Sequence, residues 1–330
     1  MELYLCIFKN KEEMDTFKVQ IEGPDFEYSS NDIDLEEHWK EASKIFEKYQ
    51  FEYQESKITL HSDFNDIFIK AKKHNEFWGG IIEIKITYDD SKHISNKENI
   101  ENFIITSFID VLFLCLNLSL PGSMAVRTPI IFHREFKDKI NLSAGYLQNS
   151  FDVSNKLGGW PDIKVIPLKH VVKWYNSLNI GLKIKAENDI ERTLFSLLYF
   201  CNDNHFGFNP TLIVWIIQSL ESFFGIKSND SIIRTLKSRI FMHLGKTLQP
   251  KIVNKKINAF YDYRSKFVHG DMEILRYGSD KFLTADTINE YYFELIKLCD
   301  FGATLIVSSL QKMIINDSNK IEFKETIVYK

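Results

Sequence analysis

An arginine and a histidine stand five residues apart, at Arg264 and His269, near the end of a stretch with helical character. Arginine is a permanent cation suited to binding phosphate, and histidine is the side chain best able to move a proton near neutral pH. Such a pair can cleave a phosphodiester without a metal ion. The spacing alone is common, and a helix-end pair that bonds carbonyls and Asp262 is the structural alternative.

Helix geometry limits how these two residues can meet. Residues five apart lie about 140° apart around a straight α-helix, so Arg264 and His269 do not share one face. Either the helix frays before Gly270 and His269 turns back, or two copies of the chain complete the site. The sequence leaves both arrangements open.

Other residues could support this pair. Glu221 stands on an apolar helix and is the best candidate for a carboxylate partner of Arg264, because an unpaired buried glutamate is costly. We expect Tyr261 and Tyr263 to pack in the core rather than to stack on bases. A basic rim for an RNA backbone could include Lys266, Arg234, Lys237 and Arg239, although a solvated helix face explains the last three nearly as well.

Two blocks in this part of the chain resemble the HEPN domain superfamily, and most closely its Apea-like family. The first is Gln218-Ser219-Leu220-Glu221-Ser222-Phe223-Phe224-Gly225, an apolar helix with a Leu-Glu pair. The second is Phe260-Tyr261-Asp262-Tyr263-Arg264-Ser265-Lys266-Phe267-Val268-His269-Gly270, which is similar to the family's tyrosine, Arg-Ser and His-Gly pattern. The resemblance covers roughly residues 170–315.

The resemblance implies a helical bundle that dimerises and a metal-independent endoribonuclease. Arg264 would hold the scissile phosphate, and His269 would serve the ribose 2′-hydroxyl or the leaving 5′-oxygen. Ser265 after the arginine fits the Apea-like branch. Asp271 stands where the toxins silenced by nucleotide attachment carry a tyrosine, so that regulation is not supported. An inactive module for dimerisation, or for binding nucleotide or RNA, is the alternative.

Apea-like relatives occur in bacterial defence against phage. The resemblance therefore implies a latent toxic effector that cuts RNA when a phage-derived trigger arrives. In that layout the N-terminal part of the chain would be the sensor. This role follows from the family and by elimination, since no motif in residues 1–150 indicates sensing.

Composition sets limits on function. The net charge is −4, so RNA must be bound through a local basic patch rather than by bulk attraction. The four cysteines are far apart, with no C-x-x-C pair, and no nucleotide-loop, zinc-protease or nucleophile-elbow motif occurs. We expect no cofactor and no metal ion.

One apolar segment, Phe103–Leu120, has the length of a membrane span but carries Asp110 at its middle. A carboxylate at mid-bilayer costs about 2.5–3.5 kcal/mol on insertion scales. We therefore expect a buried core helix, no membrane association and a cytoplasmic protein. The apolar stretch at the start of the chain is too short, and its flanks are too acidic, for a secretory signal.

The pattern of apolar residues predicts an α+β protein with two domains. We expect a mixed domain over 1–150, a linker over 151–167, a HEPN-like helical bundle over 168–316, and a tail over 317–330 that could form one strand. Strands are expected at 2–9, 17–22, 51–55, 57–61 and 80–88, and helices at 35–49, 64–73 and 98–120, followed by strands and loops over 125–150. In the bundle, helices are expected at 168–178, 187–201, 211–224, 231–248, 251–268 and 287–313.

Overall fold

The structure is a computed structural model that describes residues 16–22, 35–53, 56–65, 79–88, 97–126, 142–202, 209–226, 232–272 and 285–324. The chain divides into two compact units. The first, called here the sheet unit, comprises the described residues up to Leu112 and those between Met124 and Asn141. The second, the helical unit, comprises Phe113–Ser123 and the described residues from Leu142 onward.

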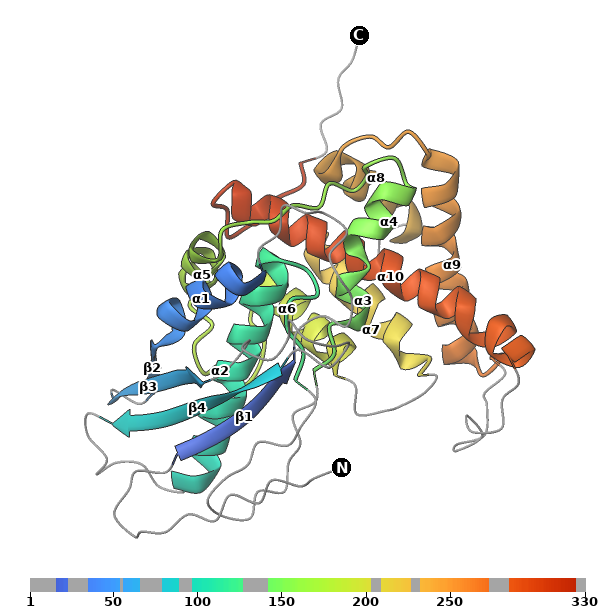
Figure 1. Cartoon of the computed structure of the whole chain (residues 1–330). Helices are drawn as coiled ribbons and strands as arrows, with labels where there is room; N and C mark the ends of the chain where they lie inside the picture. The colour runs from blue at the N-terminus through green and yellow to red at the C-terminus, as the bar shows by residue number, and fades with distance from the viewer. Residues whose placement is uncertain are drawn as a thin grey trace. The chain divides into compact units, whose positions relative to one another are not determined.

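The sheet unit contains a four-stranded antiparallel sheet with the strand order β1-β4-β3-β2 (Figure 1). Its elements are β1 (Thr16–Glu22), α1 (Leu35–Phe46), β2 (Lys48–Tyr53), β3 (Ser56–Asn65), β4 (Gly79–Tyr88) and the first part of α2 (Lys97–Ser119).

The alternation of residues along β3 and β4 gives this sheet one apolar and one polar face. Isoleucines and leucines at alternate positions, such as Leu60 and Ile84, are fully buried. They pack in a core with α1, whose Phe46 meets Phe108 of α2 edge-on at 6.1 Å between ring centroids. The intervening residues of β3 and β4, among them His61 and Lys85, form a polar face.

Helix α2 belongs to both units, because the division falls after Leu112. Its segment Asn99–Ser119 is long and apolar enough to cross a membrane, and 72% of the most apolar stretch is buried inside the structure. Asp110 lies in the middle of the helix, and burial raises the pKa of its carboxyl to about 7. A neutral acid is compatible with these apolar surroundings.

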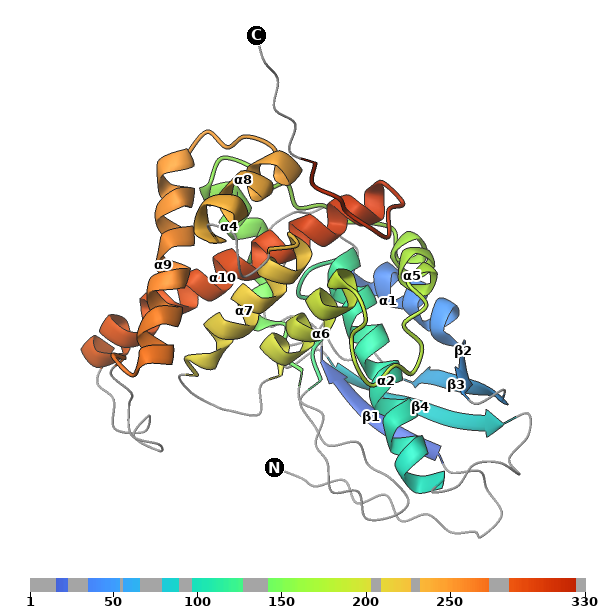
Figure 2. The same cartoon turned by 180° about the vertical axis from the view of Figure 1, so that it is seen from behind.

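The helical unit has α10 as its central helix, which packs against α3, α4, α5, α7, α8 and α9 (Figures 1 and 2). The bounds are α3 (Gly145–Gln148), α4 (Ser150–Lys156), α5 (Leu168–Ser177), α6 (Asp189–Cys201), α7 (Thr211–Phe223), α8 (Ile232–Leu244), α9 (Pro250–His269) and α10 (Ala285–Ile315).

A glycine in the middle of α10 lets the neighbouring helices approach closely. A β-carbon at Gly302 would lie 2.5 Å from the Ile216 Cγ2 atom of α7 and 3.1 Å from the ring of Phe260 of α9. Phe260 in turn stacks on Phe301 with ring centroids 5.8 Å apart. Helices α7 and α9, which carry the candidate site, are therefore held together by α10 at this crossing.

The α+β class is confirmed, and most of the predicted elements are present. The strands predicted at 17–22, 51–55, 57–61 and 80–88 correspond to β1–β4, and the helix predicted at 98–120 corresponds to α2. The six helices predicted in the bundle correspond to α5–α10. Helix α8 ends at Leu244 rather than at 248, because Gly245 follows it with a φ of +85°.

The linker predicted over 151–167 is wrong. Its beginning forms α4, and the rest packs onto the helical unit. The indole of Trp160 donates a hydrogen bond to the Gly245 carbonyl, and the Ser308 hydroxyl donates one to the Asp162 carbonyl. Glycines 158 and 159 do form a turn, but the apolar residues on either side of it are buried. The prediction thus mistook a turn within the helical unit for a boundary between two domains.

The predicted bounds or types of several other elements were wrong. Residues 64 and 65 continue strand β3 instead of starting a helix, and 66–73 lies outside the described residues. The region 145–150 forms α3 and the start of α4 rather than strands and loops. The described part of the tail, up to Lys324, is not a strand, and 325–330 lies outside the described residues, as does the strand predicted at 2–9.

Candidate functional site at the end of helix α9

Helix α9 carries both Arg264 and His269, and it is intact along its whole length. Pro250 occupies its first turn, where a missing N–H does no harm. Gly270 ends the helix with a φ of +79°, a conformation that glycine adopts without strain. The N–H groups of Gly270 and Asp271 both bond to the Lys266 carbonyl, which is the usual closure of a helix end.

The two residues lie on different faces of this helix. Arg264 is half-buried and shares the core-facing stripe with Ile257 and Tyr261. His269 is exposed, on the solvent-facing stripe that also carries Asp262. Of the other predicted supporting residues, Ser265 and Lys266 are exposed. Because the helix does not fray before Gly270, one chain does not bring Arg264 and His269 together.

Glu221 of α7 meets α9 next to Arg264. The Tyr261 hydroxyl donates a hydrogen bond of 3.0 Å to the Glu221 Oε1 atom. Burial, together with the negative charge of Glu221, raises the pKa of the Tyr261 hydroxyl far above its ordinary value, and the Arg264 guanidinium opposes this shift. Tyr261 therefore stays a neutral donor, close enough to Arg264 to feel its charge.

The ion pair predicted between Glu221 and Arg264 is not formed. The carboxylate is taken by Tyr261 instead, and neither Arg264 nor His269 makes a hydrogen bond or ion pair with any residue that the structure describes. The bonds to Asp262 and to carbonyls that would make the pair purely structural are also absent within the described ranges. Among the described residues, therefore, no partner occupies either side chain.

The basic rim is smaller than the sequence suggests. Arg239 donates from Nη1 to the Phe224 and Gly225 carbonyls, at 2.7 and 2.8 Å, and so closes the end of α7. Lys237 bonds to the side chain of Asn258 on the surface. Arg239 is a structural residue here, because its donors are turned into the protein rather than toward a nucleic acid.

A second carboxylate of the helical unit is in a very different state. Glu191, near the start of α6, has only 1% of its side chain exposed. Its oxygens accept from Lys183 Nζ at 2.7 Å and from the Glu187 N–H at 2.6 Å. Burial alone would raise the pKa of Glu191, but these hydrogen bonds outweigh it and the pKa is lowered. Asn188 caps the helix by accepting from the Glu191 N–H.

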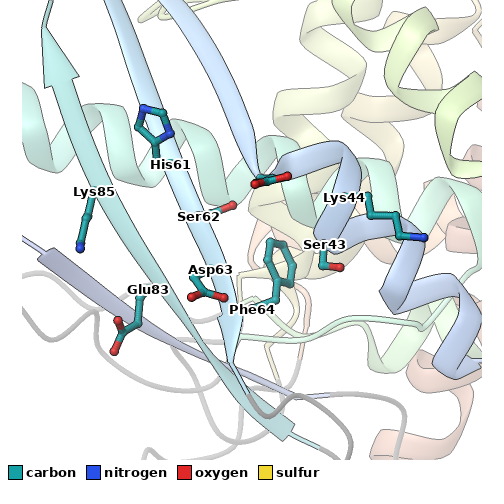
Figure 3. A pocket seen from close by; sticks show the side chains of 9 residues that line it. Ser43, Lys44, His61, Ser62, Asp63, Phe64, Glu83 and Lys85 are labelled. Atoms are coloured by element: carbon teal, nitrogen blue, oxygen red, sulfur yellow. The ribbon is translucent and has the colours of Figure 1, made fainter.

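A pocket of about 490 Å³ lies in the sheet unit, between the end of α1 and strands β3 and β4 (Figure 3). The antiparallel register places His61 opposite Lys85 and Asp63 opposite Glu83. Figure 3 shows the basic pair at one end of the polar sheet face and the acidic pair at the other. The alternation of charged residues in β3 and β4 was a visible signal, but our sequence analysis assigned it no chemistry.

Among the described residues, no group of three histidine, cysteine, aspartate or glutamate side chains could hold a metal ion. Comparisons with known proteins give no family: no protein-family model, curated protein or solved structure matches this chain. The candidate site therefore rests on its own residues. Within the part of the chain that the structure describes, it offers a half-buried guanidinium near a neutral tyrosine hydroxyl and a carboxylate, and an exposed imidazole on another face of the same helix.

Proposed function

We propose that this chain is a metal-independent endoribonuclease of HEPN type, acting in the cytoplasm as a latent toxic effector in bacterial defence against phage. The observation that carries the proposal is the state of helix α9. It holds a cation and an imidazole that are bonded to no described residue, on a rigid element with a capped end. Preorganised charge of this kind is what stabilises a phosphoryl transition state.

In the proposed reaction, Arg264 binds the non-bridging oxygens of the scissile phosphate. His269 takes the proton of the ribose 2′-hydroxyl, whose oxygen attacks phosphorus and displaces the 5′-oxygen. A second imidazole, in its protonated form, gives a proton to that leaving oxygen. The products carry a cyclic phosphate and a 5′-hydroxyl, and no oxidant or metal ion is needed.

The faces of α9 are the reason to propose a homodimer. One chain holds Arg264 and His269 about 140° apart, so a single copy does not supply both groups to one phosphate. Two copies facing each other at α9 supply two arginines and two histidines. The sheet unit would carry the response to a phage-derived trigger, a role supported only by the family resemblance.

The test is cleavage of total RNA and tRNA in EDTA by the wild type, Arg264→Ala and His269→Ala. The matched control is His61→Ala, which removes an exposed histidine from the sheet unit. With lysate from phage-infected cells added to supply the trigger, we expect cleavage by the wild type and the control only, leaving cyclic phosphate ends. If the histidine variant cuts as well as the wild type, His269 has no part in the chemistry.

Mixing the wild type with the His269→Ala variant in equal amounts tests the shared site. Half of the randomly formed dimers are then mixed and carry one His269, and a quarter are wild type. If each site needs the imidazoles of both copies, only the wild-type dimers cleave and about a quarter of wild-type activity remains, whereas a site built within one chain would keep half.

A second candidate is favoured by the position of Arg264 on the core-facing stripe of α9. A guanidinium placed there could bind RNA or a nucleotide without cleaving it, and the chain would be a dimerisation or binding module. In that case RNA binding is lost in Arg264→Ala, while no cleavage occurs with any variant, even after addition of lysate from phage-infected cells to supply a missing trigger.

A further inference from the structure

An aromatic pair on the surface of the helical unit has an open ring face. Tyr199 of α6 stacks on Trp215 of α7 with ring centroids 4.4 Å apart and planes 11° from parallel. Tyr199 nevertheless remains 58% exposed. Because one face of the tyrosine ring is covered by the indole, this exposure comes largely from the opposite face. The pair therefore presents a flat ring, held in place from below.

Trp215 of the aromatic pair lies on the same helix, α7, as Glu221 of the Glu221–Tyr261 contact and nearer to the start of that helix. Trp215, Gln218 and Glu221 follow one another at intervals of three residues, so they form a row of neighbours on the helix surface about 9 Å long. Gln218, in the middle of the row, is exposed. Figure 2 shows α7 between α6 and α9, and contacts join α7 to both. The row thus crosses the outer surface of α7 from the aromatic pair toward Arg264.

An exposed arginine accompanies this row on α6. The Ser219 hydroxyl donates to the Thr193 carbonyl at 3.1 Å, which fixes the two antiparallel helices so that Arg192 lies at the level of Leu220. Arg192 is seven residues before Tyr199 and so shares its stripe on α6. Its partner is Asp189 on the same surface, an exposed pair of the kind that contributes little and can be exchanged for a phosphate.

We propose that the Tyr199–Trp215 pair is a stacking platform for a base of single-stranded RNA, with Arg192 contacting a neighbouring phosphate and the strand leading along α7 to Arg264. This inference rests on the proposed function and names how its substrate is held. A rigid ring with one open face suits a nucleobase, because every base has a π-face and stacking on it is tolerant of sequence. The distance along α7 corresponds to one or two nucleotides.

Binding is measured on the full chain, separately from cleavage. The probe is a fluorescent single-stranded oligonucleotide with 2′-O-methyl riboses, which cannot be cut by attack of the 2′-oxygen, and the readout is anisotropy. We expect Tyr199→Ala to weaken binding about tenfold, and Tyr199→Phe to bind like the wild type because it keeps the ring. Arg192→Gln should weaken binding and lower the salt dependence by about one phosphate contact.

Two further variants guard against trivial outcomes. Tyr199→Leu keeps apolar packing on Trp215 but has no flat ring, so it should bind as weakly as Tyr199→Ala even if the alanine variant folds poorly. Phe293→Ala is the matched control, because Phe293 of α10 is an aromatic residue of similar exposure, 52%, that lies outside the row. It should bind like the wild type.

The outcomes separate this inference from the proposed function. If the wild type binds and cleaves RNA and Tyr199→Leu does the same, the platform is excluded and the ribonuclease stands. If the wild type binds, the Tyr199 variants bind weakly, and nothing is cleaved even with lysate from phage-infected cells, the platform stands and the enzyme does not. If the wild type neither binds the probe nor cleaves RNA, both are wrong and the pair serves only to join α6 to α7.

Discussion

Two glutamates on neighbouring helices, Glu191 at the start of α6 and Glu221 near the end of α7, have been given opposite surroundings. Glu191 is buried and receives a lysine, a backbone N–H and a position in a helix cap. Glu221 is half-buried and receives one neutral hydroxyl. A buried carboxylate with both oxygens hydrogen-bonded is a structural part. One with acceptor capacity to spare, next to a guanidinium, is a part that a ligand can use.

The largest difference between these two regions should appear in stability. Removing a buried carboxylate leaves Lys183 and the Glu187 N–H without their acceptor, so we expect Glu191→Ala to lower the free energy of unfolding by about 2–3 kcal/mol. Glu221→Ala should lower it by less than about 1 kcal/mol. Urea unfolding followed by circular dichroism measures both. Equal losses would remove the distinction.

A third carboxylate, Asp300 of α10, is half-buried and accepts from a neutral amide, and it should behave unlike Glu191. Burial raises the pKa of Asp300 to about 6, above its ordinary 3.8, although the Asn149 amide donates to it at 2.9 Å. The folded state therefore binds its proton more tightly than the unfolded state. Between about pH 4 and 6, this group lowers stability as the pH rises.

Asp300→Asn keeps an acceptor for Asn149 and removes the charge. We expect it to raise the free energy of unfolding by about 1–2 kcal/mol at pH 7, after allowance for partial solvation, and to have little effect at pH 4. Glu191 has the opposite sign: its lowered pKa contributes stability that is lost as the pH falls below about 4.5. Unfolding measured from pH 3.5 to 7.5 separates the two slopes.

The contact between Tyr261 and Glu221 should be worth about 1 kcal/mol. Tyr261→Phe removes the donor and leaves a carboxylate that water can still reach, so the loss is that of one hydrogen bond. A double-mutant cycle with Glu221→Ala, which removes the acceptor, measures the coupling directly. A coupling near zero would mean that Tyr261 does not hold Glu221 in place, and that the carboxylate is free to turn toward Arg264.

The smallest effect is expected at the polar face of the sheet. Asp63 stands directly opposite Glu83, and like charges in that relation destabilise a sheet by a few tenths of a kcal/mol. Asp63→Asn should therefore stabilise the protein by about that amount, with Lys57→Gln on the same strand as the control. A loss of stability instead would show that Asp63 has a favourable partner in solution.

The sequence was a good guide where a residue's local pattern decides its structure. The periodicity of α9, the proline at its start and Gly270 at its end place that helix within one residue of the prediction. The about 140° between Arg264 and His269 follows from the same geometry. Local pattern also separates the polar and apolar faces of β3 and β4.

Contacts between distant residues could not be predicted in this way. Whether Glu221 pairs with Arg264 or with Tyr261 depends on how α7 crosses α9, and that crossing depends on Gly302 of α10. The stack of Tyr199 on Trp215 depends on how far α6 is shifted along α7. The buried Ser219 hydroxyl fixes that shift by its hydrogen bond to the Thr193 carbonyl. The linker was mistaken because Trp160 is buried by Phe241, a residue 81 positions later.

The end of α2 has a consequence for dissecting this protein. The amide of Gln311 in α10 donates to the Leu118 carbonyl at 2.9 Å and to the Lys164 carbonyl at 2.7 Å, and all of it is buried. A fragment that starts at residue 142 lacks the first of these acceptors together with the apolar side chains of 113–123. Such a fragment should be insoluble when expressed alone. Co-expression with a peptide covering 97–126 should rescue it by fragment complementation, so the helical unit cannot be excised by a single cut.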